Sequence, residues 1–203
     1  EIGELASLEV LMLGGNPLDS LPHEFTRLAS LRELELWSAP MTALPDSFGN
    51  LGALERLYIG PNSLNSLPES FGGLANLREL EMVSCHTAAL PHSFGNLRAL
   101  EKLYLGGPSS LASLPESFSE LRSLRDLHIG LCNIAALPDS FGNLGALKTL
   151  SISTNSLTAL PMSFGDLASL RQLELSRTPM VRLPESFGNI ITLEHLSIGD
   201  SLS

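Results

Sequence analysis

Cysteine is scarce in this sequence, which has only Cys85 and Cys132 among 203 residues. A small scaffold held together by many disulfides is therefore excluded. The two cysteines stand at the same position of a repeat described below, two repeats apart, so their strands should lie about 10 Å from each other. A disulfide requires Cα atoms within about 7 Å, so we expect two free thiols. Free thiols are typical of a reducing compartment, which predicts an intracellular, cytoplasmic protein.

Positive charge is also scarce. Lys and Arg together number 12 against 22 Asp and Glu, the net charge is −10, and no cluster of basic residues occurs. Such a surface repels phosphate backbones, so we expect no binding to nucleic acid. No stretch of the sequence approaches the roughly 18 apolar residues that cross a membrane. We therefore expect no membrane partner either.

The sequence lacks the common catalytic and cofactor motifs. It contains no Gly-x-Ser-x-Gly, His-Glu-x-x-His or Cys-x-x-Cys and no phosphate-binding loop. The carboxylate pairs Glu33/Glu35 and Glu79/Glu81 fall on an expected open wall, without the burial that general acid–base catalysis uses to tune a pKa. His128 has no second histidine at metal-ligand spacing. We expect a protein that is not an enzyme, with no cofactor, no metal and no small-molecule substrate.

The sequence is rich, in contrast, in one repeat. Leu-Pro dipeptides recur every 23 residues, with one step of 24, and begin at Leu21, Leu44, Leu67, Leu90, Leu114, Leu137, Leu160 and Leu183. A fixed period of this length is typical of a solenoid, in which each turn packs on its neighbours. We predict a single domain over residues 1–203 with about eight and a half repeats. Both ends fall inside a repeat, which predicts a fragment of a longer protein, uncapped at both ends.

Each repeat opens with alternating apolar and polar residues, which predicts a short strand with one buried face. The inward pairs are Leu11/Leu13, Leu34/Leu36, Leu57/Ile59, Leu80/Met82, Leu103/Leu105, Leu127/Ile129, Leu150/Ile152, Leu173/Leu175 and Leu196/Ile198. They predict nine parallel strands. In the 24-residue repeat the sequence Gly-Gly-Pro at residues 106–108 predicts a bulged turn that holds the extra residue.

The second half of each repeat reads Pro-x-Ser-Phe-Gly-Asn-Leu, or a close variant. Proline suits the first turn of a short helix, and the glycine is expected to end that helix with a positive φ. All eight phenylalanines share one position: Phe25, Phe48, Phe71, Phe94, Phe118, Phe141, Phe164 and Phe187. We predict that they form a continuous buried stack.

Aligned on their leucines, the repeats read Leu-x-x-Leu-x-Leu-x-x-(Asn/Cys/Thr)-x-Leu-x-x-Leu-Pro-x-Ser-Phe-Gly-Asn-Leu-x-x. This pattern resembles the leucine-rich repeat family, in the 23-residue typical type of bacterial effectors, plant immune receptors and Ras-suppressor-like proteins. The resemblance implies an α/β solenoid. It would be a curved right-handed superhelix with nine parallel strands on the concave face and short helices or 3₁₀ turns on the convex face.

The resemblance also implies a role for the ninth residue of each repeat. In the family this side chain turns inward and bonds to the backbone of neighbouring turns. In this chain the position holds Asn16, Asn62, Cys85, Cys132, Asn155 and Thr178. The second repeat has Ala39 there, so the side-chain ladder should be weaker at that point.

Two outward positions of the predicted strands carry charges whose sign alternates from strand to strand. One of these rows reads Glu33, Arg56, Glu79, Lys102 and Asp126. Neighbouring like charges would repel each other, so the alternation indicates cross-strand ion pairs rather than contacts to a partner.

A third outward row differs, because aromatic and acidic residues dominate it. We call these six residues the acidic aromatic patch: Glu35, Trp37, Tyr58, Glu81, Tyr104 and His128. Trp and Tyr are frequent anchors of interfaces, and carboxylates beside rings favour a partner segment with Lys or Arg. Cross-strand packing among exposed aromatics would explain the same residues without a partner.

We therefore predict a protein–protein interaction module whose concave face binds a protein with a basic segment. The alternative is the substrate-recognition domain of a multidomain virulence effector with a separate catalytic, ubiquitin ligase-like domain. The ten arginines against two lysines of this chain favour that alternative, in which the compartment would be the host cytoplasm. A third interpretation is a structural array without a partner.

Overall fold

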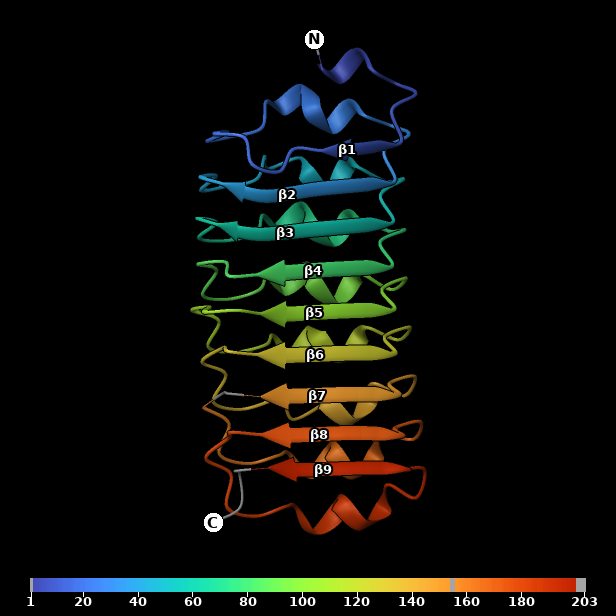
Figure 1. Cartoon of the computed structure of the whole chain (residues 1–203). Helices are drawn as coiled ribbons and strands as arrows, with labels where there is room; N and C mark the ends of the chain where they lie inside the picture. The colour runs from blue at the N-terminus through green and yellow to red at the C-terminus, as the bar shows by residue number, and fades with distance from the viewer. Residues whose placement is uncertain (1, 154–155, 200–203) are drawn as a thin grey trace.

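A computed structural model describes residues 2–153 and 156–199, and in this part of the chain the predicted solenoid is confirmed (Figure 1). Its strands are β1 (Val10–Met12), β2 (Glu33–Ala39), β3 (Arg56–Asn62), β4 (Glu79–Val83), β5 (Lys102–Gly106), β6 (Asp126–Gly130), β7 (Thr149–Ser153), β8 (Gln172–Ser176) and β9 (His195–Gly199). All pair in parallel and in chain order, forming one open sheet.

Short 3₁₀ helices form a second layer behind the sheet (Figure 1). They are η1 (Ile2–Glu4), η2 (His23–Arg27), η3 (Phe48–Asn50), η4 (Glu69–Gly73), η5 (His92–Asn96), η6 (Glu116–Glu120), η7 (Phe141–Asn143), η8 (Met162–Asp166) and η9 (Glu185–Asn189). Proline precedes each of the six described five-residue helices. It stands at the N-cap in extended conformation, one residue before the first turn in which it was predicted. Within the described ranges, no helix is both long and apolar enough to span a membrane.

The register between strands stays constant along the sheet. Residues one repeat apart face each other, so Leu34 pairs with Leu57, and Leu57 with Leu80. The 24-residue step does not break this register, because Leu103 still pairs with Leu127. Gly107 follows β5 with a φ of 76°, so the extra residue lies in a turn beyond the strand, as predicted.

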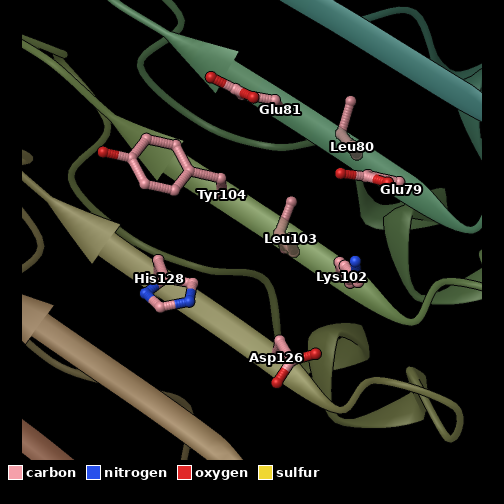
Figure 2. Close-up of a pocket in the computed structure, with 8 residues that line it drawn as sticks. All are labelled: Glu79, Leu80, Glu81, Lys102, Leu103, Tyr104, Asp126 and His128. Carbon is pink, nitrogen blue, oxygen red and sulfur yellow. The ribbon is translucent and has the colours of Figure 1, made fainter.

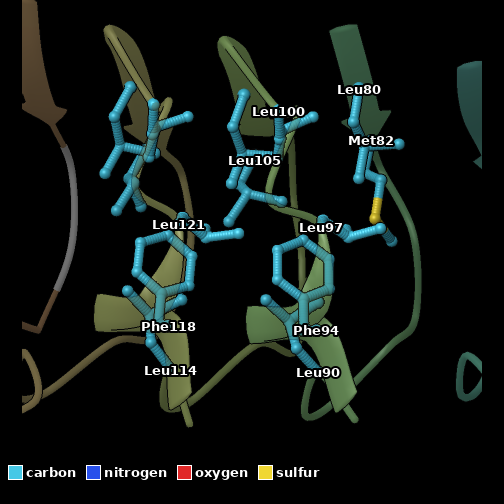
Figure 3. Packing of buried hydrophobic residues seen from close by; sticks show 14 of the residues in the cluster. Leu80, Met82, Leu90, Phe94, Leu97, Leu100, Leu105, Leu114, Phe118 and Leu121 are labelled. Atoms are coloured by element: carbon cyan, nitrogen blue, oxygen red, sulfur yellow. The ribbon is translucent and has the colours of Figure 1, made fainter. Parts of the chain in front are cut away.

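Leucines and phenylalanines fill the space between the two layers (Figure 3). Neighbouring phenylalanine rings from Phe48 to Phe187 stack with centroids 6.0–6.4 Å apart and planes within 8°. The predicted stack is confirmed over this range. Phe25 is also fully buried, whereas Phe187 in the last helix is only partly buried.

The two layers differ in spacing, and this difference curves the solenoid. Adjacent strands in a sheet lie about 4.8 Å apart, whereas the phenylalanine rings behind them are 6.0–6.4 Å apart. The sheet is therefore the inner, shorter side of the curve. We call its solvent-facing side the inner wall.

Glycine follows six of the eight phenylalanines, and the positive φ predicted for it is wrong. The positive-φ glycines of the described residues are Gly15, Gly60 and Gly107. A Cβ atom at Gly49 would instead lie 1.7 Å from the carbonyl oxygen of Ser70, and one at Gly142 would lie 1.9 Å from that of Ser163. At Gly49 and Gly142 the backbone of the next repeat packs directly against the glycine, which leaves no room for a side chain.

The ninth-position ladder is present at several repeats. Asn62 accepts a hydrogen bond from the Leu64 amide (2.9 Å) and donates one to Cys85 Sγ (3.7 Å). The Cys132 thiol donates to the Leu105 carbonyl of the preceding turn at 3.9 Å and to the Gly130 carbonyl of its own turn at 3.4 Å. Asn16 is exposed and donates to the carbonyls of its own turn, Thr178 is buried, and Asn155 lies outside the described residues.

Two repeats lack a polar side chain at the aligned ninth position, and in each a different contact takes its place. Ala39 offers no polar side chain, but its backbone pairs with Asn62, so β2 and β3 are each seven residues long. In the 24-residue repeat the Ser109 hydroxyl accepts a hydrogen bond from the Leu111 amide at 3.2 Å. Ser109 thus performs the role of the asparagine, which the sequence alignment missed because the insertion shifts it by one position.

Apolar side chains are exposed at both ends of the described solenoid. Leu5 and Met12 are exposed in the first turn, and Ile191 and Leu196 in the last. The extent of the domain and its place in a longer protein stay predictions.

We expect Gly142→Ala to lower stability by about 1–3 kcal/mol, because the new methyl group collides with the backbone of the next repeat. Gly188→Ala is the matched control, since nothing lies within 4 Å of a Cβ atom at the same repeat position. Urea unfolding of both variants measures the difference. Equal unfolding midpoints would show that close packing does not select this glycine.

Both cysteine thiols should be unreactive in the native protein. Burial raises the pKa of Cys85 and Cys132 to about 11, so only about one thiol in a thousand is ionised at pH 8. A chromogenic disulfide reagent should titrate two thiols per chain after denaturation and none before. Leu131→Cys, at an exposed position beside Cys132, should react at once. Native thiols that react as fast as this control would contradict the assigned burial.

Candidate functional site

The residues of the acidic aromatic patch lie together on the inner wall. Glu35 pairs with Tyr58 across β2 and β3, and Tyr58 with Glu81 on β4. Glu81 pairs with Tyr104 on β5, which pairs with His128 on β6. Trp37 is two residues beyond Glu35 on β2 and therefore points to the same face. Constant register thus turns positions scattered over almost a hundred residues into one row across five strands.

The rings of this row form two pairs on neighbouring strands. Trp37 and Tyr58 stack with centroids 6.0 Å apart and planes at 21°. Tyr104 and His128 also lie 6.0 Å apart, at 33°. The cross-strand packing considered from the sequence is therefore present. It does not bury the rings, since Tyr104 remains 44% exposed and the others are half-buried.

Glycines lie beside two of the rings. A Cβ atom at Gly106 would stand 2.4 Å from Cε1 of Tyr104, and one at Gly14 would stand 3.3 Å from Cδ1 of Trp37. Trp37 is held further by a hydrogen bond from Nε1 to Glu35 Oε2 at 3.2 Å. These contacts orient the rings before any partner binds.

A hollow of about 320 Å³ opens over β4, β5 and β6 (Figure 2). Two rows of side chains cross it: Glu81, Tyr104 and His128 in one row, and Glu79, Lys102 and Asp126 in the other. A second hollow of about 610 Å³ extends from His128 over β7 to β9 and includes Ser151, Gln172, Glu174 and His195. This second region does not stand out in the sequence, because its outward residues include no tryptophan or tyrosine.

Cross-strand ion pairs form among the alternating charges of the inner wall, which confirms the prediction in part. Among the described residues of the row from Glu33 to Asp126, only Arg56 and Glu33 form such a pair. The described pairs are Arg32–Glu55 (2.5 Å), Arg56–Glu33 (2.5 Å), Arg78–Glu101 (2.7 Å), Arg125–Glu101 (3.3 Å) and Arg171–Glu194. Exposed pairs of this kind contribute about 0–1 kcal/mol each. Within the described ranges, neither Glu35 nor Glu81 takes part in an ion pair.

The patch is short of positive charge. Partial burial raises the pKa of Glu81 above its ordinary value, and the negative charge of Glu79 on the same strand raises it further. The pKa of Tyr58 is raised by the same two causes in the same order. Both shifts mean that additional negative charge is unfavourable here, and the part that comes from Glu79 would favour a cation.

No group of three or more His, Cys, Asp or Glu in the described chain is arranged to hold a metal ion. The patch presents large rings, carboxylates and an imidazole on an open wall.

The repeat pattern and the fold together point to one family. A sequence profile described as a leucine-rich repeat region matches residues 24–132 and 116–203, and one described as a leucine-rich repeat matches residues 7–28. The chain belongs to the leucine-rich repeat family. Comparison with curated proteins gives no match.

Solved structures similar to this leucine-rich repeat chain include the following three. The plant peptide hormone receptor RGFR1 in complex with RGF2 is 27% identical, with a TM-score of 0.74 over 98% of this chain and 37% of the receptor chain. The leucine-rich repeat domain of the type III effector XopL is 25% identical, with a TM-score of 0.73 over 93% of this chain and 76% of that domain. TLR13 in complex with ssRNA13 is 27% identical, with a TM-score of 0.84 over 98% of this chain and 30% of that chain. This chain thus spans about a third of each receptor.

The raised pKa of Glu81 predicts a pH-dependent loss of stability. As the pH rises past 4.5, the unfolded chain releases this proton before the native protein does, so ionisation favours unfolding and the cost persists at higher pH. We expect Glu81→Gln to be more stable than the parent at pH 7, by less than about 1 kcal/mol, with the gain shrinking toward pH 4.

Urea unfolding at both pH values measures this gain. Glu174→Gln, at the equivalent exposed position of β8, is the matched control and should gain nothing. A Glu81→Gln variant that is less stable than the parent at pH 7 would contradict the prediction.

Proposed function

We propose that this chain is a protein-recognition module whose inner wall binds a protein partner through the acidic aromatic patch. The observation that carries the proposal is the row of pre-oriented, accessible rings and carboxylates across β2 to β6. Aromatic residues that remain accessible on a rigid sheet are effective anchors, because little side-chain freedom is lost on binding. The family membership supports this proposal, since solenoid repeats present extended curved surfaces suited to partners.

The partner segment is proposed to be basic. Glu35 and Glu81 lie outside the ion pairs that occupy the neighbouring rows, and the whole chain carries a net charge of −10. A lysine or arginine at the patch would meet a carboxylate and a ring at once. Charge complementarity of this kind would also speed association at low salt.

The similar structures include both a peptide complex and an RNA complex, and the charge of this chain favours a peptide or protein. The peptide hormone receptor RGFR1 was solved in complex with RGF2, whereas TLR13 was solved in complex with a single-stranded RNA. An acidic inner wall repels a phosphate backbone, so the comparison with TLR13 does not extend to its ligand.

A role as the recognition domain of an intracellular or host-delivered effector is a second candidate. Its support is the similarity to the XopL domain, of which this chain covers 76%, together with the excess of arginine over lysine. Catalysis would then belong to a separate domain of the native protein. An assay of the native protein for ubiquitin transfer, with isolated residues 1–203 as the control, tests this candidate.

We expect the combined variant Trp37→Ala, Tyr58→Ala and Tyr104→Ala to lose its partner, because truncation of an aromatic anchor costs about 2 kcal/mol or more. The measurement is affinity capture from a lysate of the source cells, with quantification of each captured protein. Circular dichroism and thermal melts establish that the variant remains folded.

The matched control replaces three exposed apolar residues away from the patch, in Met162→Ala, Val181→Ala and Ile191→Ala. This control should capture the same proteins as the parent. If the patch variant also captures the same set in the same amounts, the patch is not the binding site.

A further inference from the structure

The acidic aromatic patch contains one arrangement twice. Glu35 and Glu81 are 46 residues apart, as are Tyr58 and Tyr104, so the second arrangement lies two repeats after the first. In each, a carboxylate faces a tyrosine on the next strand: Glu35 faces Tyr58, and Glu81 faces Tyr104. The patch therefore offers two places for a cation, each with a carboxylate and a tyrosine. They differ in one neighbour, because Trp37 binds Glu35 whereas Val83 holds the corresponding position beside Glu81.

The neighbouring charges leave these two carboxylates available. Arg56 donates two hydrogen bonds to Glu33 Oε2, at 3.0 and 2.5 Å, and so is directed away from Glu35. Lys102 lies in the other row of the hollow, between Glu79 and Asp126 (Figure 2). The raised pKa of Glu81 agrees with a carboxylate that no cation of the chain neutralises.

The distance between the two places follows from the sheet. Glu35 and Glu81 stand on β2 and β4, and both pair in register with Tyr58 on β3. Two strand spacings separate them, which is about 9.6 Å. Because the inner wall is the short side of the curve, points above it lie slightly closer together.

Few backbone conformations repeat at this distance on one face. A polyproline II segment has three residues per turn and a rise of 3.1 Å, so side chains at i and i+3 point the same way about 9.3 Å apart. An extended strand brings side chains back to one face at i+2, about 6.8 Å apart. In an α-helix, side chains at i and i+7 point the same way and lie about 10.5 Å apart. This distance is longer than the separation of the two carboxylates, whereas the curve of the wall requires a slightly shorter one.

We propose that the inner wall binds a polyproline II segment with Lys or Arg at every third position, successive cations lying against Glu35–Tyr58 and Glu81–Tyr104. This inference rests on the proposed function and adds the conformation and the spacing of the partner. The segment would run along the solenoid axis, across the strands. A polyproline II segment has low conformational entropy before it binds, so little entropy is lost when its cations, already at the required spacing, meet the two carboxylates.

Trp37 provides the readout, because it is the only tryptophan of the chain and is hydrogen-bonded to Glu35. Its fluorescence is titrated with proline-based peptides that carry two arginines at i and i+3, at i and i+2, or at i and i+4. A helical peptide with arginines at i and i+7 is the fourth ligand. Calorimetry repeats each titration independently of the fluorophore.

We expect the i, i+3 peptide to bind about tenfold more tightly than the other three, with an affinity that falls as salt is added. Glu35→Gln and Glu81→Gln should each weaken it about fivefold, since each removes one ion pair beside a ring. Glu174→Gln, at the same repeat position of β8, is the matched control and should leave the affinity unchanged.

The other outcomes overturn the inference in different ways. Equal binding of all four peptides would mean that the patch recognises positive charge without regard to its spacing. The polyproline II inference would then be wrong, and the proposed function would be unaffected. Tightest binding of the helical peptide would assign the surface to a helix. If no peptide binds, the polyproline II inference is wrong, and the capture experiment with the alanine variants decides separately on the proposed function.

Discussion

The packing of each turn directly against the next is the constraint on which this structure depends. A single turn has too few apolar groups to offset the entropy of its ordering, so its stability comes from the interfaces on either side. Those interfaces consist of the leucines, the phenylalanine stack and a glycine that allows backbone contact. The wider spacing of the rings behind the more closely spaced strands sets the direction in which the sheet curves.

The fold could be predicted because its determinants repeat. Leucine alternation, the Leu-Pro step and the shared phenylalanine position each recur in register, so every repeat supports the same assignment. The glycine was misinterpreted because its cause is a carbonyl group about 20 residues away rather than the local turn. Ser109 was missed because the inserted residue displaces it from the aligned position.

The candidate site was predictable as a row of residues but not as a geometry. Strand alternation places Glu35, Tyr58, Glu81, Tyr104 and His128 on one face, and constant register aligns them. The division of the rings into two pairs depends on side-chain rotamers, and so does the commitment of Arg56 to Glu33. These details matter, because they determine which carboxylates remain available for a partner.

The constant register has a consequence for how such a surface can change in evolution. Since turns contact only their neighbours, duplication of a 46-residue segment would add two strands without disturbing the others. The copy would carry its own carboxylate and tyrosine, already in phase with the existing row. A longer ligand could then be accommodated by gene duplication alone, and the affinity would increase through the number of copies before any contact had been optimised.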